Sequence, residues 1–224
     1  MFTGFEDRRV AGKALAVKLR AYKGDPDALV LALPRGGVPV AFEVAKALDL
    51  PLDVFVVRKL GVPWQPEFAF GAIASGGVRI LNKQTVHSLQ LSELLIDAVS
   101  KNEQMELERR EWLYRGDRPA LNVSGKTVIV VDDGLATGST MRAAVRAVKL
   151  QNPAKIVVAA PVASRETCDR FFADTDNLCI SVITPEPFYG VGVWYGNFSQ
   201  TTDEEVQTLL AKAAESRNAW RSAA

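Results

Sequence analysis

The chain has 224 residues, and its 27 Lys and Arg side chains nearly balance its 26 Asp and Glu side chains, for a formal net charge of +1. This balance gives no electrostatic case for a nucleic-acid partner or an anionic membrane, so any anion site must be local. The first residues lack the apolar core of a signal peptide, and no apolar run approaches the roughly 18 residues of a membrane span. We therefore expect a cytoplasmic protein without membrane contact.

Residues 9–48 predict a strand with a helix on either side of it. Apolar residues at helical spacing among Arg and Lys indicate a surface helix over residues 9–22. The continuous apolar run at residues 28–33 is typical of a strand that is buried on both faces. This strand ends at Pro34-Arg35-Gly36-Gly37, and the apolar stretch at residues 38–48 predicts a helix directly after the loop.

Residues 51–81 predict another strand of the core and an antiparallel appendage. The strand covers residues 51–57. The glycine and prolines of residues 58–67 indicate an irregular excursion that can act as a mobile flap. Residues 68–75 and 78–81 predict a hairpin, because the paired glycines between them suit a tight turn. The flap is expected to span about residues 58–81.

Residues 92–150 predict a long helix and then a strand that delivers polar groups to the edge of the sheet. Ser92 is a candidate cap for the helix over residues 92–114. The β-branched run at residues 128–131 indicates a buried strand, which is followed by a helix over residues 140–150. Because open α/β sheets bind ligands at the carboxyl ends of their strands, the residues between this strand and its helix are the first place to look for a site.

The last part of the chain continues the alternation of strands and helices. Strands are expected over residues 155–162 and 178–184, with a helix capped by Ser164 between them, ending near residue 172. An aromatic-rich loop at residues 185–200 precedes a terminal helix, capped by Thr202 or Asp203, that ends near residue 216. This order predicts an α/β fold with a doubly wound, mostly parallel, Rossmann-like sheet that is covered on both faces, in a single domain over residues 1–224.

The cysteines and the single histidine give no sign of metal or nucleophilic chemistry. Cys168 and Cys179 have no metal-type spacing, and we expect small, reduced core residues there rather than a disulfide or a nucleophile. His87 lies in a polar stretch after the hairpin and is expected at the surface rather than in catalysis.

The stretch after residues 128–131 has the chemistry of a ribose phosphate site. Adjacent carboxylates, Asp132 and Asp133, can accept hydrogen bonds from the two ribose hydroxyls. The turn after them opens a helix, whose first amides suit a phosphate. No Gly-Lys-Ser/Thr ending is present, so this is not a Walker loop, and no suitably spaced helix follows Gly190-Val-Gly192, so that stretch is not a Rossmann fingerprint. The candidate phosphate-binding residues are Ala136, Thr137, Gly138, Ser139 and Thr140.

Residues 128–140, with four apolar residues, two acids and a Thr-Gly-x-Thr turn, resemble the phosphoribosyl-diphosphate (PRPP) binding motif of type I phosphoribosyltransferases. In that family a nitrogen nucleophile displaces diphosphate from the anomeric carbon, through a transition state like an oxocarbenium ion. The resemblance implies that Asp132 and Asp133 favour the positive charge developing on the ribose, while Mg²⁺ and basic groups stabilise the departing diphosphate. It also implies that both acids take part in the metal site through ribose hydroxyls and water.

The loop Pro34-Arg35-Gly36-Gly37 resembles the diphosphate loop of the same family. Glycines at Gly36 and Gly37 let backbone amides approach the diphosphate, and Arg35 can supply a planar charged fork. The resemblance implies a cis peptide bond at Pro34-Arg35 or Arg35-Gly36. A plain helix-entry turn is the alternative.

The segment that begins with Arg58 and Lys59 is similar to the start of the catalytic flap in adenine-type members. The resemblance implies that both cations reach the diphosphate when the flap closes and excludes water. Lys and Arg are usually solvated surface charges, which is the alternative interpretation.

The aromatic stretch at residues 188–198 resembles the base-recognition segment of purine-type members, which forms a hood at about residues 185–200. Phe188, Trp194 and Tyr195 are the candidates for stacking on a base, and aromatic plugs of the core are the alternative. In related chains an acid soon after the aromatic pair helps to place metal. Gly196 and Asn197 occupy that region here, which puts a second metal site in doubt.

Together these features predict a Mg²⁺-dependent phosphoribosyltransferase of nucleotide metabolism and nucleoside salvage. It would transfer the 5-phosphoribosyl group of PRPP to a nitrogen acceptor, expected to be a nucleobase, and release diphosphate; the family implies a homodimer. A regulatory protein that senses PRPP or a nucleotide without turnover is the alternative, against which the presence of Arg35, Arg58 and Lys59 favours catalysis. A phosphatase or nucleotidase would need an obvious phosphoryl acceptor or a metal-ligand cluster, and we find neither in the sequence.

Overall fold

A five-stranded parallel sheet forms the centre of the computed structural model, which describes residues 4–174 and 178–223. Strands β1 and β6 are neighbours in this sheet although a long stretch of chain separates them, and the strand order reverses direction between them. In open α/β sheets such a switch point is where ligands bind. The sheet order is β2 (Leu52–Val54), β1 (Ala28–Ala32), β6 (Thr127–Val131), β7 (Lys155–Val162) and β8 (Leu178–Ile183).

Helices cover both faces of the parallel sheet, as the alternating pattern predicted. Helices α1 (Arg8–Lys18) and α2 (Gly37–Leu48) pack on one face, and α5 (Ser139–Lys149) and α6 (Arg165–Asp174) pack on the other. The period of two along each strand divides the core, since Ile129 contributes to the first face and Val128 to the second. All five residues of β1 are buried, and burying one Val or Leu side chain contributes about 1.5–3 kcal/mol.

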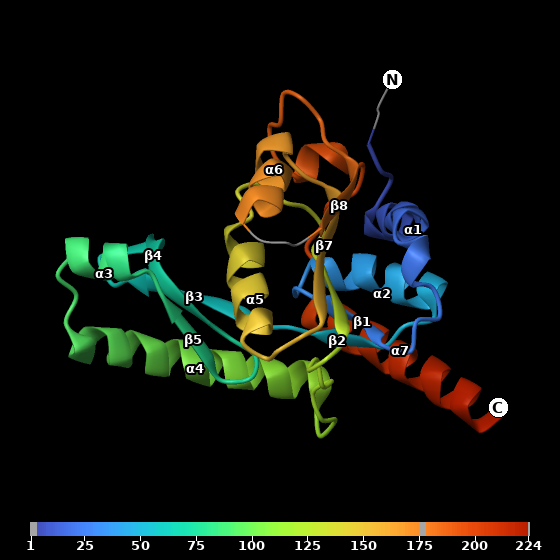
Figure 1. The fold of residues 1–224 in the computed structure, drawn as a ribbon, viewed down its shortest axis with the longest axis horizontal. Coiled ribbons are helices and arrows are strands. Elements are labelled where there is room, and N and C mark those ends of the chain that lie inside the picture. Colours follow the sequence, from blue (N-terminus) through green and yellow to red (C-terminus); the bar gives the residue numbers. More distant parts are fainter. Residues whose placement is uncertain (1–3, 175–177, 224) are drawn as a thin grey trace.

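A second, antiparallel sheet forms an arm that extends away from the core (Figure 1). The hairpin at the paired glycines is confirmed, because Gly76 and Gly77 have φ values of 85° and 74°. Helix α4 runs under both the arm and the core, and the predicted cap Ser92 accepts a hydrogen bond from the Leu95 amide. The elements of the arm are β3 (Val57–Val62), β4 (Gln65–Ala74), β5 (Val78–Leu81), α3 (Lys83–Ser88) and α4 (Glu93–Arg115).

The prediction of an irregular excursion over residues 58–67 is wrong. Strands β3 and β4 occupy most of it and pair with each other, with register shifts on both sides of Gly61. Leu60 and Val62 are buried, and their alternation with outward side chains holds the segment as a strand despite its glycine and prolines. A Cβ at Gly61 would collide with the Pro66 backbone, so the glycine permits close approach of two strands.

Several predicted boundaries change by a few residues. The helix expected over residues 9–22 ends at Lys18 and continues as a 3₁₀ turn, Arg20–Tyr22. The terminal helix α7 (Asp203–Ala223) continues beyond residue 216, and Thr202 supplies its cap by accepting from the Glu205 amide. Within the part that the structure describes, no helix has the length and apolar character to cross a membrane.

Cys168 and Cys179 are free, half-buried thiols whose Sγ atoms lie 2.9 Å apart, between α6 and β8. Their contact lowers the pKa of Cys168 to about 7 and, with burial, raises the pKa of Cys179. His87 is exposed on α3, as predicted.

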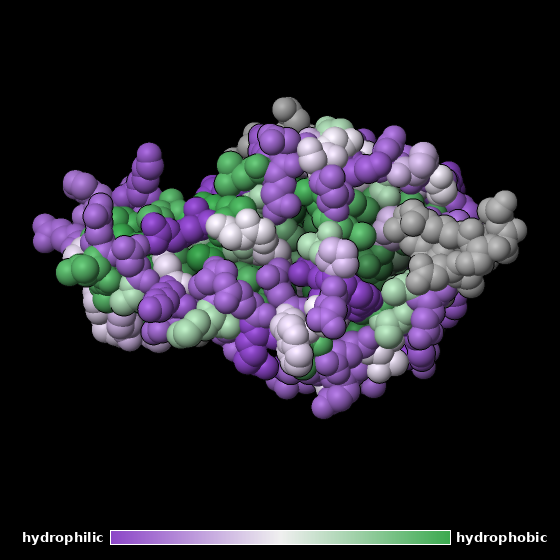
Figure 2. Space-filling model, turned by 90° about the horizontal axis from the view of Figure 1, so that it is seen from below, coloured by the Kyte–Doolittle hydropathy of each residue, from purple (hydrophilic) through white to green (hydrophobic). Residues whose placement is uncertain are grey.

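Most of the surface seen from below is hydrophilic, with apolar areas between the charged side chains (Figure 2). Helix α4 contributes large exposed apolar side chains, since Leu94 is 85% and Trp112 is 70% exposed. These two side chains are separate exposed apolar points on α4, with charged residues between them.

Candidate functional site

The loops that follow β1 and β6 meet at the switch point of the sheet. The Leu33 amide donates to the Val131 carbonyl at 2.8 Å, which brings the two strand ends together. A Cβ at Gly37 would lie 2.8 Å from the Val131 carbonyl oxygen, and one at Gly36 would collide with the Asp133 carboxylate. The paired glycines are therefore required for the first loop to lie against the two acids. The peptide bond Pro34-Arg35 is cis, as the resemblance implied.

Asp132 and Asp133 are half-buried at the end of β6. The Asp133 amide donates to Asp132 Oδ1 at 2.9 Å. Burial raises the pKa of the Asp132 carboxyl well above its usual range, and the neighbouring Asp133 charge adds to the shift. Burial also raises the pKa of Asp133, although the Arg8 guanidinium opposes this shift. Two adjacent carboxylates in this setting favour a ligand that supplies hydrogen-bond donors and positive charge.

Arg8 is a residue of the site that the sequence interpretation missed. Its Nε lies 2.8 Å from Asp133 Oδ2, with side chains only 12% and 16% exposed. Its Nη1 donates to the Ser199 carbonyl at 2.7 Å, and its Cζ lies 4.0 Å from the centre of the Phe198 ring. Arg8 thus joins the acids to the C-terminal loop. No local motif could have revealed this contact, because 125 positions separate the two partners.

The turn between β6 and α5 is held from below by α6. Gly138 has a φ of 66° and caps α5, so the helix begins at Ser139. The Thr167 hydroxyl donates to the Ala136 carbonyl at 2.5 Å, and Arg142 donates to the Thr137 carbonyl at 2.5 Å. These bonds occupy the carbonyls of the turn. Within the turn the Ser139 amide donates to Thr137 Oγ1 at 3.4 Å, so these groups gather at the start of α5, where a helix stabilises a phosphate.

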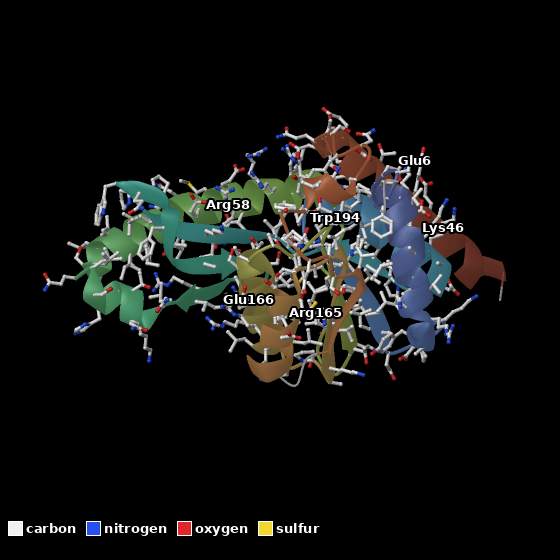
Figure 3. All side chains as sticks on the ribbon, turned by 90° about the horizontal axis from the view of Figure 1, so that it is seen from above. Glu6, Lys46, Arg58, Arg165, Glu166 and Trp194 are labelled. Carbon is white, nitrogen blue, oxygen red and sulfur yellow. The ribbon has the colours of Figure 1, made fainter. Side chains whose placement is uncertain are left out.

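The predicted basic residues are divided among three places. Arg35 lies near the first residue of α7, with its Nη1 3.7 Å from Asp203 Oδ1. Arg58 forms an ion pair with Glu103 of α4 at 2.6 Å, and Figure 3 shows it on the arm, away from Trp194. Lys59 is its neighbour on β3 and faces α5 instead, in a cleft that Ser139 also lines. The structure therefore brings Lys59, and not Arg58, towards the turn.

The aromatic candidates differ in their surroundings. Tyr195 is 5% exposed, its hydroxyl donates to the Asp133 carbonyl at 2.6 Å, and burial raises its pKa. Its ring stacks on Phe198 with 5.0 Å between centres. Trp194 Nε1 is buried and has no hydrogen-bond partner among the described residues, whereas Phe188 is half-buried in the same small cluster. Tyr195 thus positions the backbone of the acid pair, and Trp194 carries an unused donor.

The two acids have the chemistry of a magnesium site that is completed by a ligand. Carboxylate oxygens suit Mg²⁺, which usually keeps water and phosphate oxygens as its other ligands. In the described ranges no three His, Cys, Asp or Glu side chains are grouped as a metal site. The donor set therefore fits a cation that arrives with a phosphorylated ligand better than one held by the protein alone.

Comparisons with known proteins give the following matches. The family model for the phosphoribosyl transferase domain matches residues 7–181. A Mycobacterium tuberculosis (strain H37Rv) protein named "putative phosphoribosyl transferase" is 46% identical over 209 residues, and the chain spans 47%, about half, of the length of that curated relative and 93% of its own. The crystal structure of TT1426 from Thermus thermophilus is 40% identical, with a TM-score of 0.81 over 94% of this chain and 99% of that one.

Proposed function

The chain belongs to the phosphoribosyl transferase domain family, and we propose on this basis that it transfers the 5-phosphoribosyl group of PRPP to a nitrogen acceptor. The anomeric carbon–oxygen bond to diphosphate breaks, a carbon–nitrogen bond forms, and the acceptor nitrogen loses its proton. The observation that carries the proposal is the meeting of the loop at residues 34–37 with Asp132 and Asp133 at the switch point. We infer a cytoplasmic enzyme with one catalytic domain over residues 1–224.

The donor would be divided between the two loops. Asp132 and Asp133 accept hydrogen bonds from the ribose hydroxyls, and the turn at residues 136–140 holds the 5′-phosphate at the start of α5. Arg35, Gly36 and Gly37 hold the diphosphate. This assignment is supported by the close approach of both glycines to the acid pair, because it places the backbone of the first loop directly beside the ribose site.

Charge stabilisation would supply most of the catalysis. The two carboxylates favour the positive charge that develops on the ribose, in a setting where burial already disfavours their own unpaired charge. When bound, Mg²⁺ would supply charge neutralisation for the leaving diphosphate. Lys59 and Arg58 would approach the diphosphate as the arm closes, and for Arg58 closure requires that its ion pair with Glu103 breaks.

The acceptor would lie between the aromatic loop and the acids, with Phe188, Trp194 and Tyr195 as its surroundings. The buried Nε1–H of Trp194 has no partner among the described residues. It supports a substrate that can accept a hydrogen bond, such as a nucleobase of nucleoside salvage. Helix α4, which exposes Leu94, Met105 and Trp112, is a candidate surface for the homodimer.

The experiment is the release of diphosphate from PRPP and Mg²⁺ across a panel of nucleobases. We expect release with at least one base and none with the double variant Asp132→Asn/Asp133→Asn. Release from the double variant at the rate of the unmodified protein would contradict the site assignment.

A PRPP- or nucleotide-sensing regulatory protein is the second candidate. The ion pairs that hold Arg58 on Glu103 and Arg8 on Asp133 favour it, because they occupy two of the charged groups of the site. PRPP binding in a calorimeter without diphosphate release for any base would favour this function over transfer.

A further inference from the structure

A basic cleft separates the arm from helix α5. It has a volume of about 170 Å³ and lies on the side of α5 that faces β4 and β5. Lys59 lines it from the arm, and Arg142 and Arg146 line it from the helix, where Nη2 of Arg142 also donates to the Thr137 carbonyl. Ser139 and Asn82 also line the cleft. Among the described residues that line the cleft, none is acidic.

The two arginines share one face of α5 because they are one helical turn apart. Like charges at this spacing destabilise a helix, and the described part of α5 contains no acidic residue to offset them. On two other helices, arginines form ion pairs with an acid of the same helix. Glu106 of α4 pairs with both Arg109 and Arg110, and Glu166 of α6 pairs with Arg170. The basic face of α5 has no acid on its own helix to pair with.

Lys59 adds a third cation from the opposite wall. The strand period turns its side chain to the face opposite Arg58, so Lys59 does not share the acid that neutralises its neighbour. Three cations thus converge on a cavity that holds the volume of roughly five or six water molecules, at about 30 Å³ each.

We propose that this cleft is a second anion site, which adjoins the PRPP site through Ser139 and Lys59 and binds the phosphate groups of a polyphosphate. Lys59, Arg142 and Arg146 are its cations, and the Ser139 hydroxyl and the Asn82 amide are its neutral donors. The cavity takes phosphate groups but is too small for a whole nucleotide, so a nucleoside would remain outside. An inorganic polyphosphate and the phosphate chain of a nucleoside 5′-triphosphate share the chemistry that the cleft recognises.

The test is calorimetric titration of the full chain with inorganic triphosphate, without PRPP, base or Mg²⁺. We expect saturable binding that weakens at least tenfold in Arg146→Gln. The matched control is Lys149→Gln, which removes a cation from the same helix outside the cleft and should bind as the unmodified protein does. Arg35→Gln should also retain binding, because Arg35 lies at the other anion site. Equal thermal unfolding midpoints would show that Arg146→Gln is folded.

Three outcomes would overturn the proposal: no binding by the unmodified protein, equal binding by Arg146→Gln, or an equal loss in Lys149→Gln or Arg35→Gln. ATP in place of triphosphate separates the two sources, since tighter binding of ATP would assign a nucleoside 5′-triphosphate and equal or weaker binding the inorganic chain. The titration contains no reaction components, so its failure leaves diphosphate release untouched, and a failure of phosphoribosyl transfer leaves this binding untouched.

Discussion

Replacing Asp132 by Asn should stabilise the folded protein but weaken its binding of PRPP. Asn keeps the shape of the side chain and the Oδ1 that accepts the Asp133 amide at 2.9 Å, but removes a buried charge beside another acid. Each unit by which burial raises the pKa of Asp132 above its ordinary value of 3.8 corresponds to about 1.4 kcal/mol lost at neutral pH. We therefore expect a gain in the free energy of unfolding on the order of 1–3 kcal/mol at pH 7.

The sign of the pH dependence follows from the direction of this shift. Because the folded pKa of Asp132 lies above the unfolded one, the wild-type chain loses stability as the pH rises from 3.8 to the folded pKa. The advantage of Asp132→Asn is therefore complete above the folded pKa, shrinks as the pH falls through it, and disappears below the unfolded pKa.

The assay is denaturant unfolding followed by circular dichroism at pH 7 and at low pH, with PRPP calorimetry on the same samples. PRPP affinity should fall at least tenfold, about 1.4 kcal/mol. The exposed Asp117→Asn serves as a control and should change stability by no more than about 0.5 kcal/mol. A less stable Asp132→Asn at pH 7, or a gain of the same size at both pH values, would refute the reasoning.

Three other substitutions test the surroundings of the acids. Arg8→Gln should cost about 2–4 kcal/mol in unfolding free energy, because it leaves the Asp133 carboxylate buried without its partner; a loss under 1 kcal/mol would count against this. Lys59→Ala should lower kcat more than PRPP affinity, and equal losses would place Lys59 in the ground-state site. Thr167→Val removes the donor to the Ala136 carbonyl and should weaken PRPP binding by about 1–3 kcal/mol, as seen by calorimetry; unchanged affinity would show that the turn does not need α6.

The sequence was most informative where one strand and its loop carry the information locally. The apolar run at residues 128–131 and the two acids after it predict both the strand and the edge where it ends, and the structure agrees to within a residue. The paired glycines at residues 36 and 37 are likewise visible in the local sequence. The acids that make them necessary follow another strand.

Features that depend on distant partners were not predictable in this way. Arg8 lies in an ordinary amphipathic helix, and only the fold brings it to Asp133. Gly61 and its neighbouring prolines suggested an irregular segment, because local breakers are visible in a sequence while the pairing with β4 is not. Once β3 is known to be a strand, the opposite directions of Arg58 and Lys59 follow from its period of two.

The C-terminal loop is joined to the first residues of the chain that the structure describes. Phe5 pairs with Tyr195, the Gly196 amide donates to the Phe5 carbonyl at 2.8 Å, and the Asn197 amide donates to the Glu6 carbonyl at 2.8 Å. Residues 5 and 6 can pair with residues 195–197 only after the segment that contains the latter has been synthesised, and such long-range pairing slows folding. All five strands of the parallel sheet lie between residues 28 and 183, so the ribosome completes the sheet before this pairing can close the site.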